Sequence, residues 1–403
     1  MRGILASYLT LLIVLAGLAV GGGFYVVRET GPSDAVEAAA DANAYNLVSW
    51  ELRHLPGKWL YKLGHLFDGR DRADEEESLR RYFTLTQEIQ QMEQGPAANA
   101  LRLEEAEDQR AALENEVEDI LEGRITSLLE EQGLVVNPPL FSDLNLVFPP
   151  VDFEFDTPPR VLAISPRDRI ELDRNFLLTP GLDLDTIVDI EIESETAAVD
   201  EASGISAIVL PTGGVATYPS VVNELASYRS LINTVIHEWT HQYLAFFPLG
   251  RSYFASNELR TLNETVASLA GQELARLFIE RYGSPELPPS PAATPNSDFD
   301  FFSEMQALRQ QVEVLLADGL IDEAEALMDQ KRQEFEEQGV FVRRINQAYF
   351  AFRGFYATSS GSIDPIGPKM RELLASAGSP GEFVRLAAAL TSEADLDRLL
   401  AQG

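Results

Sequence analysis

Helical spacing of apolar residues dominates the chain. Residues 74–132 are rich in Glu, Leu, Ala and Arg and are interrupted at Gly95-Pro96, which predicts two long helices in a hairpin. Residues 301–338 predict a second helical hairpin that turns at Asp318-Gly319. Residues 35–67 and the region that follows the second hairpin also have helical patterns. We therefore expect a mainly helical protein.

A different pattern occupies residues 138–195, where prolines separate short extended runs such as 160–165 and 187–192. Residues 205–210 form another strand-like run. An extended segment at 214–218 comes next, and the proline after it suits the edge of a sheet. These runs predict a small β module, so the expected fold class is α+β.

The central helix is predicted over residues 230–246, which are apolar at helical spacing. Within it, His237-Glu238-Trp239-Thr240-His241 places two histidines one turn apart, so both imidazoles leave the same face and can bind one metal ion. Glu238 points about 100° round the helix, where its carboxylate reaches a water on the metal rather than the metal itself. This arrangement is typical of zinc hydrolases. The alternative is two surface histidines on an amphipathic helix, which the apolar flanks disfavour.

A catalytic zinc ion usually has three protein ligands and one open position. No histidine follows His241 in the sequence, so the third ligand has to be a carboxylate. The candidate is Glu264, at the start of a second predicted helix. Ala267 and Gly271 share its face, and their small side chains would let the two helices approach closely. The alternative role for Glu264 is a favourable interaction with the helix dipole.

These residues resemble the gluzincin metallopeptidases, in which a His-Glu-x-x-His helix is followed by an Asn-Glu-x-x-Ala-like helix, here residues 263–267. More narrowly, the chain is similar to the bacterial family described as predicted aminopeptidases, because Gln242 follows the second histidine. Asn346-Gln347-Ala348, with Tyr356 ten residues after the asparagine, resembles a third block of that family. The resemblance covers roughly residues 205–390. It implies a zincin-like catalytic core, Zn²⁺ as the cofactor and hydrolysis of peptide bonds.

The resemblance also implies roles for single residues. Three would bind the zinc ion: His237, His241 and Glu264. Glu238 would take the proton of the attacking water and pass it to the leaving amine. Tyr356 would donate to the oxyanion, with Tyr349 in reserve. Both tyrosines lie on one apolar helical stripe, for which core packing is the alternative.

Two further residues or segments are candidates for binding the substrate. In zincins an edge strand beside the metal helix commonly binds the substrate backbone, so residues 214–218 are a candidate shelf, with an ordinary hairpin strand as the alternative. An aminopeptidase also needs a carboxylate for the free amino terminus. Glu224 is a candidate, with a helix-dipole partner as the alternative. The choice between exopeptidase and endopeptidase stays open, and the resemblance favours an aminopeptidase.

Residues 4–27 have no charged side chain and are long enough to span a bilayer. Arg2 precedes them and acidic residues soon follow, with Arg28 the single basic residue nearby, so we expect the N-terminus in the cytoplasm and the body outside. The small residues near the end of the run make a poor cleavage site. An uncleaved, single-pass anchor in the cell membrane is therefore predicted.

The charge and the absence of cysteine exclude several classes. A net charge of −33 makes nucleic acid and anionic lipid poor partners. Without cysteine the chain has no lipoprotein anchor, no disulfide and no thiolate zinc ligand. Histidines and carboxylates are left as the metal ligands.

The sequence thus predicts five regions. They are an anchor (1–30), a helical segment with a hairpin (31–135), a β-rich module with the catalytic core (136–283), a Pro-rich linker (284–300) and a C-terminal helical region that can complete the active site (301–403). The expected function is a membrane-anchored, extracytoplasmic zinc metallopeptidase that acts on peptides or proteins. Two alternatives are a catalytically degenerate zincin-fold protein that binds partners, and a scaffold built on the helical hairpins. No pattern indicates an oligomeric state.

Overall fold

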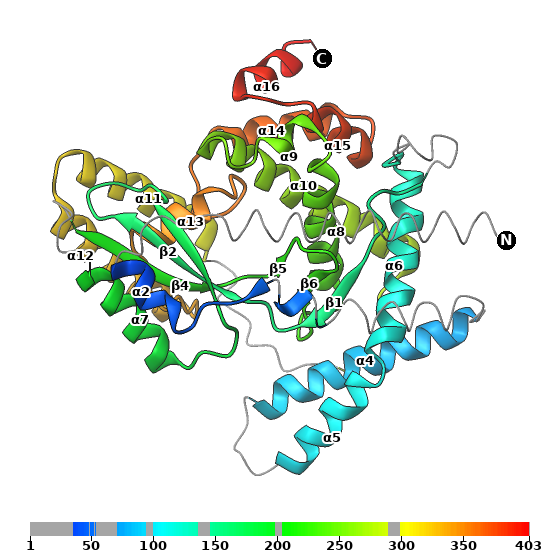
Figure 1. Cartoon of the computed structure of the whole chain (residues 1–403). Helices are drawn as coiled ribbons and strands as arrows, with labels where there is room; N and C mark the ends of the chain where they lie inside the picture. Colours follow the sequence, from blue (N-terminus) through cyan, green and yellow to red (C-terminus); the bar gives the residue numbers. More distant parts are fainter. Residues whose placement is uncertain are drawn as a thin grey trace.

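The computed structural model describes residues 35–53 apart from 48 and 52, and residues 71–93, 100–135, 146–197, 204–288 and 299–402. Over these residues the fold is α+β and mainly helical, which confirms the predicted class (Figure 1). Among the helices described, none is both long and apolar enough to cross a bilayer. The span predicted at residues 4–27 lies outside the described residues.

One sheet is antiparallel, with the strand order β3-β2-β4. Its strands are β2 (Arg160–Pro166), β3 (Arg174–Leu178) and β4 (Ile205–Pro211). Alternate side chains of β2 and β4 pack against α2 (Ala35–Asp41) and α7 (Leu184–Ala197) on one face, and against helices from residues 301–354 on the other. Because helices cover both faces, β2 and β4 are apolar at most positions, and this made them predictable.

The extended run predicted at residues 187–192 is wrong, because these residues lie in α7. Apolar and acidic residues alternate from residue 189 to 193, which imitates a strand. The buried positions have helical spacing instead: Ile187, Ile190, Glu191 and Ser194. Asp183 caps the helix, since its Oδ1 accepts a hydrogen bond from the Thr186 amide at 2.7 Å.

The second sheet has the order β1-β6-β5. Its strands are β1 (Phe153–Asp156), β5 (Gly214–Val215) and β6 (Ser220–Asn223). β1 runs parallel to β6, and β5 runs antiparallel to β6 on its other side. β5 is therefore an edge strand, as predicted for residues 214–218, although only two residues of that segment pair.

The predicted helical hairpins form with one difference. Residues 301–338 fold into α11 (Phe301–Ala317) and α12 (Ile321–Glu337), and the turn uses Gly319 at φ +75°. Residues 72–131 form three helices rather than two: α4 (Arg72–Glu93), α5 (Ala100–Ala111) and α6 (Glu114–Glu131). The extra break at Ala112-Leu113 has no glycine or proline, so the pattern gives no signal for it.

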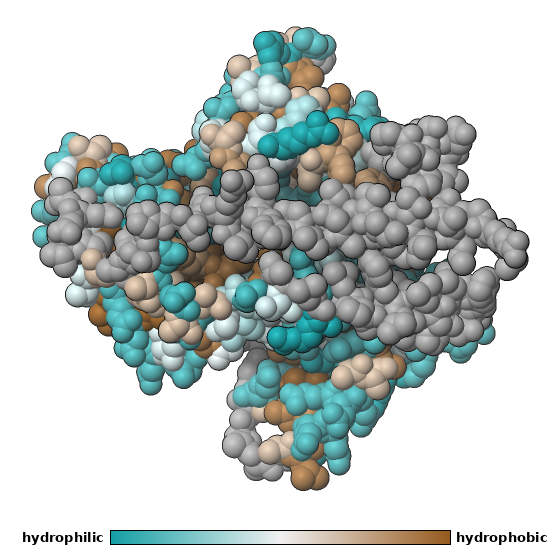
Figure 2. All heavy atoms as spheres, viewed as in Figure 1, coloured by the Kyte–Doolittle hydropathy of each residue, from teal (hydrophilic) through white to brown (hydrophobic). Residues whose placement is uncertain are grey.

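The main core surrounds α8 (Tyr228–Leu244) and α10 (Asn257–Tyr282), which pack against each other. Around them lie α4, α6, β1 and four further helices: α9 (Pro248–Arg251), α14 (Ile366–Ser376), α15 (Pro380–Ala388) and α16 (Glu393–Leu400). α13 (Gln347–Gly354) packs on β2 and β4 instead. Figure 1 shows α13 between the β2–β4 sheet and the helices around α10. Much of the outer surface drawn in colour is hydrophilic (Figure 2).

Candidate metal centre

The two histidines of α8 converge on one point. Ser227 caps the helix, and the apolar residues between the cap and His237 are buried, which fixes the orientation of the helix. His237 and His241 lie on the same face, with 3.1 Å between their Nε2 atoms and 4.7 Å between their ring centroids. Both side chains are 14% exposed. The sequence predicted this pairing from the spacing alone.

Glu264 reaches the histidines from the neighbouring helix. α10 begins at Asn257 and is capped by Ser256, so Glu264 lies two turns inside the helix. The prediction that Glu264 lies at the start of this helix is therefore wrong. Since the helix dipole acts within the first turn, this position removes the support for a helix-dipole role. The predicted close approach of the helices is confirmed at Gly271, where a Cβ would lie 2.8 Å from the Asn233 carbonyl oxygen.

The three ligand atoms have the spacing of a zinc site. Oε2 of Glu264 lies 3.7 Å from Nε2 of His237 and 3.4 Å from Nε2 of His241. Ligand atoms at tetrahedral angles about 2.0–2.1 Å from zinc are about 3.3–3.4 Å apart. Oε2 is buried, accepts no hydrogen bond of good geometry, and faces the Nε2 atoms of both histidines, so a metal ion placed between these atoms would satisfy it. The residues present therefore fit a zinc ion.

The carboxylate of Glu238 also lies near the histidines, since its oxygen and their ring nitrogens are within 4.8 Å of one another. Glu264 is the better third ligand, because its Oε2 is closer to both Nε2 atoms. Glu238 is buried, and a Cβ at Gly214 would lie 2.8 Å from its Oε1. The backbone of the edge strand β5 therefore rests directly on Glu238. The shelf predicted at residues 214–218 lies beside the metal helix, and its use by a substrate stays a prediction.

Opposite charges inside the site balance one another. Burial opposes ionisation of Glu264, yet His241 and His237 hold the pKa of its carboxyl well below its usual range. Burial also disfavours charge on His241, but Glu264 and Glu238 raise the pKa of its imidazole to about 9. Burial raises the pKa of Glu238, with the two histidines acting in the opposite direction. Protons and a cation therefore compete for the same atoms.

Two residues that the sequence analysis missed hold the ligands in place. Asn263 Oδ1 lies 2.7 Å from Nδ1 of His241, so Nδ1–H donates to it and leaves Nε2 free to bind a metal. The Tyr253 hydroxyl donates to Oε1 of Glu264 at 2.5 Å, which leaves Oε2 facing the histidines. Asn263 directly precedes Glu264 in the Asn-Glu block, so its place in that block could have identified it from the sequence. Tyr253 lies in the loop between the helices, where no spacing identifies it.

Tyr356 lies beside the centre and Tyr349 does not contact it. The ring of Tyr356 is 6.3 Å from the ring of His237, and burial raises the pKa of its hydroxyl well above the usual value, with Glu264 adding to the effect. Ala357 fixes this segment on α10, because its amide donates to Thr265 Oγ1 at 3.2 Å. Tyr356 follows the end of α13, so the predicted helical stripe does not reach it. Tyr349 is in α13 and packs against Phe350.

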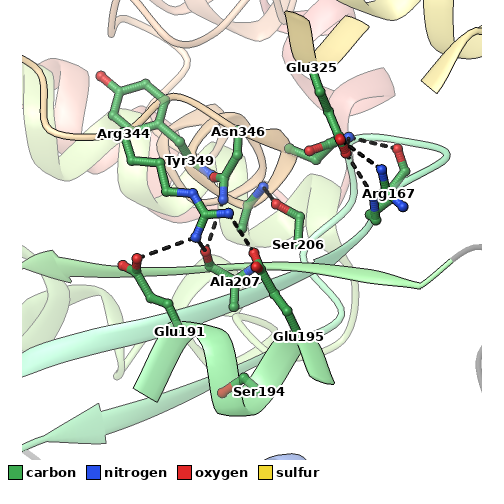
Figure 3. Close-up of polar contacts among 12 residues, drawn as sticks. Arg167, Glu191, Ser194, Glu195, Ser206, Ala207, Glu325, Arg344, Asn346 and Tyr349 are labelled. Atoms are coloured by element: carbon green, nitrogen blue, oxygen red, sulfur yellow. Dashed lines mark hydrogen bonds and ion pairs between the residues drawn. The ribbon is translucent and has the colours of Figure 1, made fainter. Parts of the chain in front are cut away.

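The Asn346-Gln347-Ala348 block holds α13 on the sheet rather than contributing to the metal centre. Asn346 caps α13 through the Tyr349 amide and donates to the Ala207 carbonyl of β4 at 2.9 Å. Figure 3 shows Arg344 donating to the same strand, with Glu191 and Glu195 beside it. A cavity of about 750 Å³ lies here, and no metal-centre residue lines it. The block thus positions the chain that leads to Tyr356.

Glu224 is engaged elsewhere. Its Oε2 accepts from Arg110 of α5 at 2.5 Å and its Oε1 accepts from the Thr157 hydroxyl at 3.3 Å. It precedes the start of α8 at Tyr228, so it is not a helix-dipole partner of the kind considered above. Its carboxylate is therefore not free to bind a substrate amino terminus.

Comparisons of the chain with protein-family models, with curated proteins and with solved structures give no match. Inferences about its function therefore rest on the geometry of the residues themselves.

Proposed function

We propose that this protein is a zinc-dependent peptidase with a zincin-like catalytic core, held at the cell membrane by residues 4–27 with its body outside the cytoplasm. One observation carries the proposal. Three ligand atoms from two helices lie 3.1 to 3.7 Å apart, and the glutamate that follows the first histidine lies beside them under an edge strand. Such a site serves water activation next to an extended peptide.

Each side chain has a separate task in the proposed reaction. A zinc ion held by the three ligands would activate a water molecule and polarise the scissile carbonyl. Glu238 takes the proton of the water and delivers it to the leaving amine. Asn263 fixes the His241 ring through Nδ1, and Tyr253 fixes Glu264 through Oε1. These contacts keep the ligand atoms in position before substrate arrives.

The developing oxyanion needs a hydrogen-bond donor besides the metal. Tyr356 is the proposed donor, because it lies on the His237 side of the centre. Tyr253 lies on the His241 side, 6.2 Å from that ring, and its hydroxyl already donates to Glu264. Buried phenols keep their proton at neutral pH when their pKa is raised, and this applies to both tyrosines.

The edge strand β5 is the proposed substrate shelf. Its inner edge pairs with β6, and no other described strand pairs with its outer edge, which a peptide backbone would join. Gln242 steadies the turn after β5 by donating to the Thr217 carbonyl and to the Ser220 hydroxyl. An extended peptide added to β5 would cross Glu238, because the Gly214 backbone rests on that carboxylate.

Peptide cleavage tests the proposal directly. The zinc-loaded protein is incubated with a mixed peptide library, and each peptide is also supplied with an acetylated amino terminus. Wild type should cleave, Glu238→Gln should hold zinc without cleaving, and Glu273→Gln should behave as wild type, because Glu273 is a surface partner of Arg276 on α10. Cleavage by Glu238→Gln at the wild-type rate would refute the proposed base. Equal cleavage of free and acetylated peptides would exclude an aminopeptidase.

Protease treatment of intact spheroplasts tests the location. Protease added outside should degrade the body after residue 27 and leave the anchor. Full protection of the body would show that it lies in the cytoplasm.

A further inference from the structure

Arg260 lies one helical turn from the metal centre. It precedes Glu264 by four residues on α10, so the two side chains share a face and start about 6 Å apart along the helix. Its Cζ lies 4.4 Å from the ring centroid of Phe355 and 5.5 Å from that of Tyr253. Phe355 precedes Tyr356, and Tyr253 donates to Glu264. The guanidinium is therefore held against Tyr253 and against the residue that precedes Tyr356.

Arg260 contacts the Tyr253 hydroxyl, but its buried Nε makes no hydrogen bond. Among the described residues no carboxylate oxygen lies within 4.0 Å of its guanidinium, and its buried Nε has no hydrogen-bond partner. Arg276 on the same helix, in contrast, pairs with two glutamates. The aromatic rings stabilise the charge of Arg260 but accept few of its five N–H groups. A part-buried guanidinium whose Nε has no partner keeps donors for an acceptor beyond the described chain.

We propose that Arg260 binds a carboxylate of the substrate, in a residue next to the scissile bond. This inference rests on the proposed peptidase function. A guanidinium offers two parallel donors that match a carboxylate, and packing on rings fixes the orientation of that fork. The rest of the protein repels anions, since the net charge is −33, so an anionic substrate requires a dedicated cation near the metal. The carboxylate belongs either to the peptide C-terminus or to an Asp or Glu side chain.

Binding of matched peptides distinguishes the two sources. One pair of peptides differs only in a free or amidated C-terminus, and a second pair differs only in Glu or Gln beside the scissile bond. Their dissociation constants are measured by calorimetry with zinc-loaded Glu238→Gln protein, in which the peptides stay intact. The carboxylate member of one pair should bind about 10- to 100-fold more tightly than its neutral partner, as a charge-assisted hydrogen bond predicts.

Variants at Arg260 show whether this residue causes the preference. Arg260→Gln, added to the same protein, should make the dissociation constants of the two members of the pair equal. Arg260→Lys should keep only part of the ratio between these constants, because the ammonium lacks the planar fork. Arg276→Gln removes a charge from the exposed end of the same helix and should leave the ratio unchanged. A purely structural role for Arg260 would change the binding of both members equally.

The results separate this inference from the proposed function. Equal binding of carboxylate and neutral peptides, together with cleavage by wild type, would overturn the role of Arg260 and leave the peptidase standing. Failure of wild type to cleave or bind any of the peptides would overturn both. If Arg260→Gln does not fold, by circular dichroism, an unchanged ratio in Arg260→Lys would overturn the inference.

Discussion

Gly271 lies where the two helices that carry the proposed metal ligands approach closely, and Gly271→Ala tests whether that contact sets the metal site. A Cβ there would lie 2.8 Å from the Asn233 backbone oxygen, whereas ordinary contacts begin at 3.4 Å. The helices must therefore separate by about 0.6 Å at this point, because close-packed interiors have little room to absorb it. Asn233 is on α8, one turn before His237. The strain is thus applied across the interface that the ligands span.

The expected size of the effect follows from the tolerance of metal sites. Zinc sites keep their ligand distances within about 0.2 Å, which is smaller than the displacement imposed by the new methyl group. Glu264 lies two turns from Gly271 on α10, so it moves with that helix. We expect zinc affinity to fall about 10- to 100-fold, comparable to the loss of a residue that orients a ligand. Overpacking should also lower the free energy of unfolding by about 1–3 kcal/mol.

Zinc affinity is measured by competition with a chelator of known affinity, and stability by thermal unfolding of the metal-free protein. Gly123→Ala is the matched control. Gly123 is inside helix α6 and a Cβ there would meet nothing within 4 Å, so alanine should stabilise the protein by up to about 1 kcal/mol. This control separates the effect of the new contact from the general effect of replacing a helical glycine.

Two results would refute the reasoning. Unchanged stability of Gly271→Ala would mean that the helices do not approach as closely as described. Lower stability with unchanged zinc affinity would mean that the metal ligands do not span the interface between α8 and α10. Glu264 would then not be the third ligand.

Four further predictions follow from single residues. Glu264→Ala should lose zinc while the helices stay folded, and full zinc occupancy by metal analysis would rule it out as a ligand. Asn263→Ala should weaken zinc binding about 10- to 100-fold, and unchanged affinity would show that the His241 contact does not matter. Tyr356→Phe should lower kcat with little change in KM, whereas a loss of stability alone would assign it to packing. Burial raises the pKa of Glu114 to about 7, so the folded state holds the extra proton and the free energy of unfolding should fall as the pH rises from about 4.5 to 7. Glu114→Gln should make the fall in the free energy of unfolding less steep in denaturant titrations at several pH values, and an unchanged slope would contradict this prediction.

The sequence predicted those parts of the site that depend on local spacing. The helix around residues 237–241 and the small residues of α10 could be identified because a helix repeats its faces every three or four residues. The position of Glu264 within α10 was less predictable. The cap at Ser256 lies eight residues before it, and the loop residues between the helices have no periodicity. The beginning of the helix was therefore placed too late.

The remaining parts depend on contacts between distant segments. α7 was mistaken for a strand because its short acidic and apolar alternation fits both periods, and packing against β4 and α2 decides between them. Tyr253 and Arg260 make contacts with residues that are distant in the sequence or separated from them by a loop. Tyr253 meets Glu264 across a loop, and Arg260 meets Phe355 from a segment almost a hundred residues later. The spacing of residues in a single sequence cannot predict contacts of this kind between separate segments.

The C-terminal region therefore belongs to the site by its contacts with α10. Phe355 lies against Arg260, and the Ala357 amide donates to Thr265, so the chain on either side of Tyr356 is attached next to Glu264. A change in the α10 backbone would move Glu264, the proposed metal ligand, and Tyr356 together. This shared support places Tyr356, after the end of α13, beside His237 of α8. It also implies that the region after residue 301 cannot be removed without disturbing the metal centre.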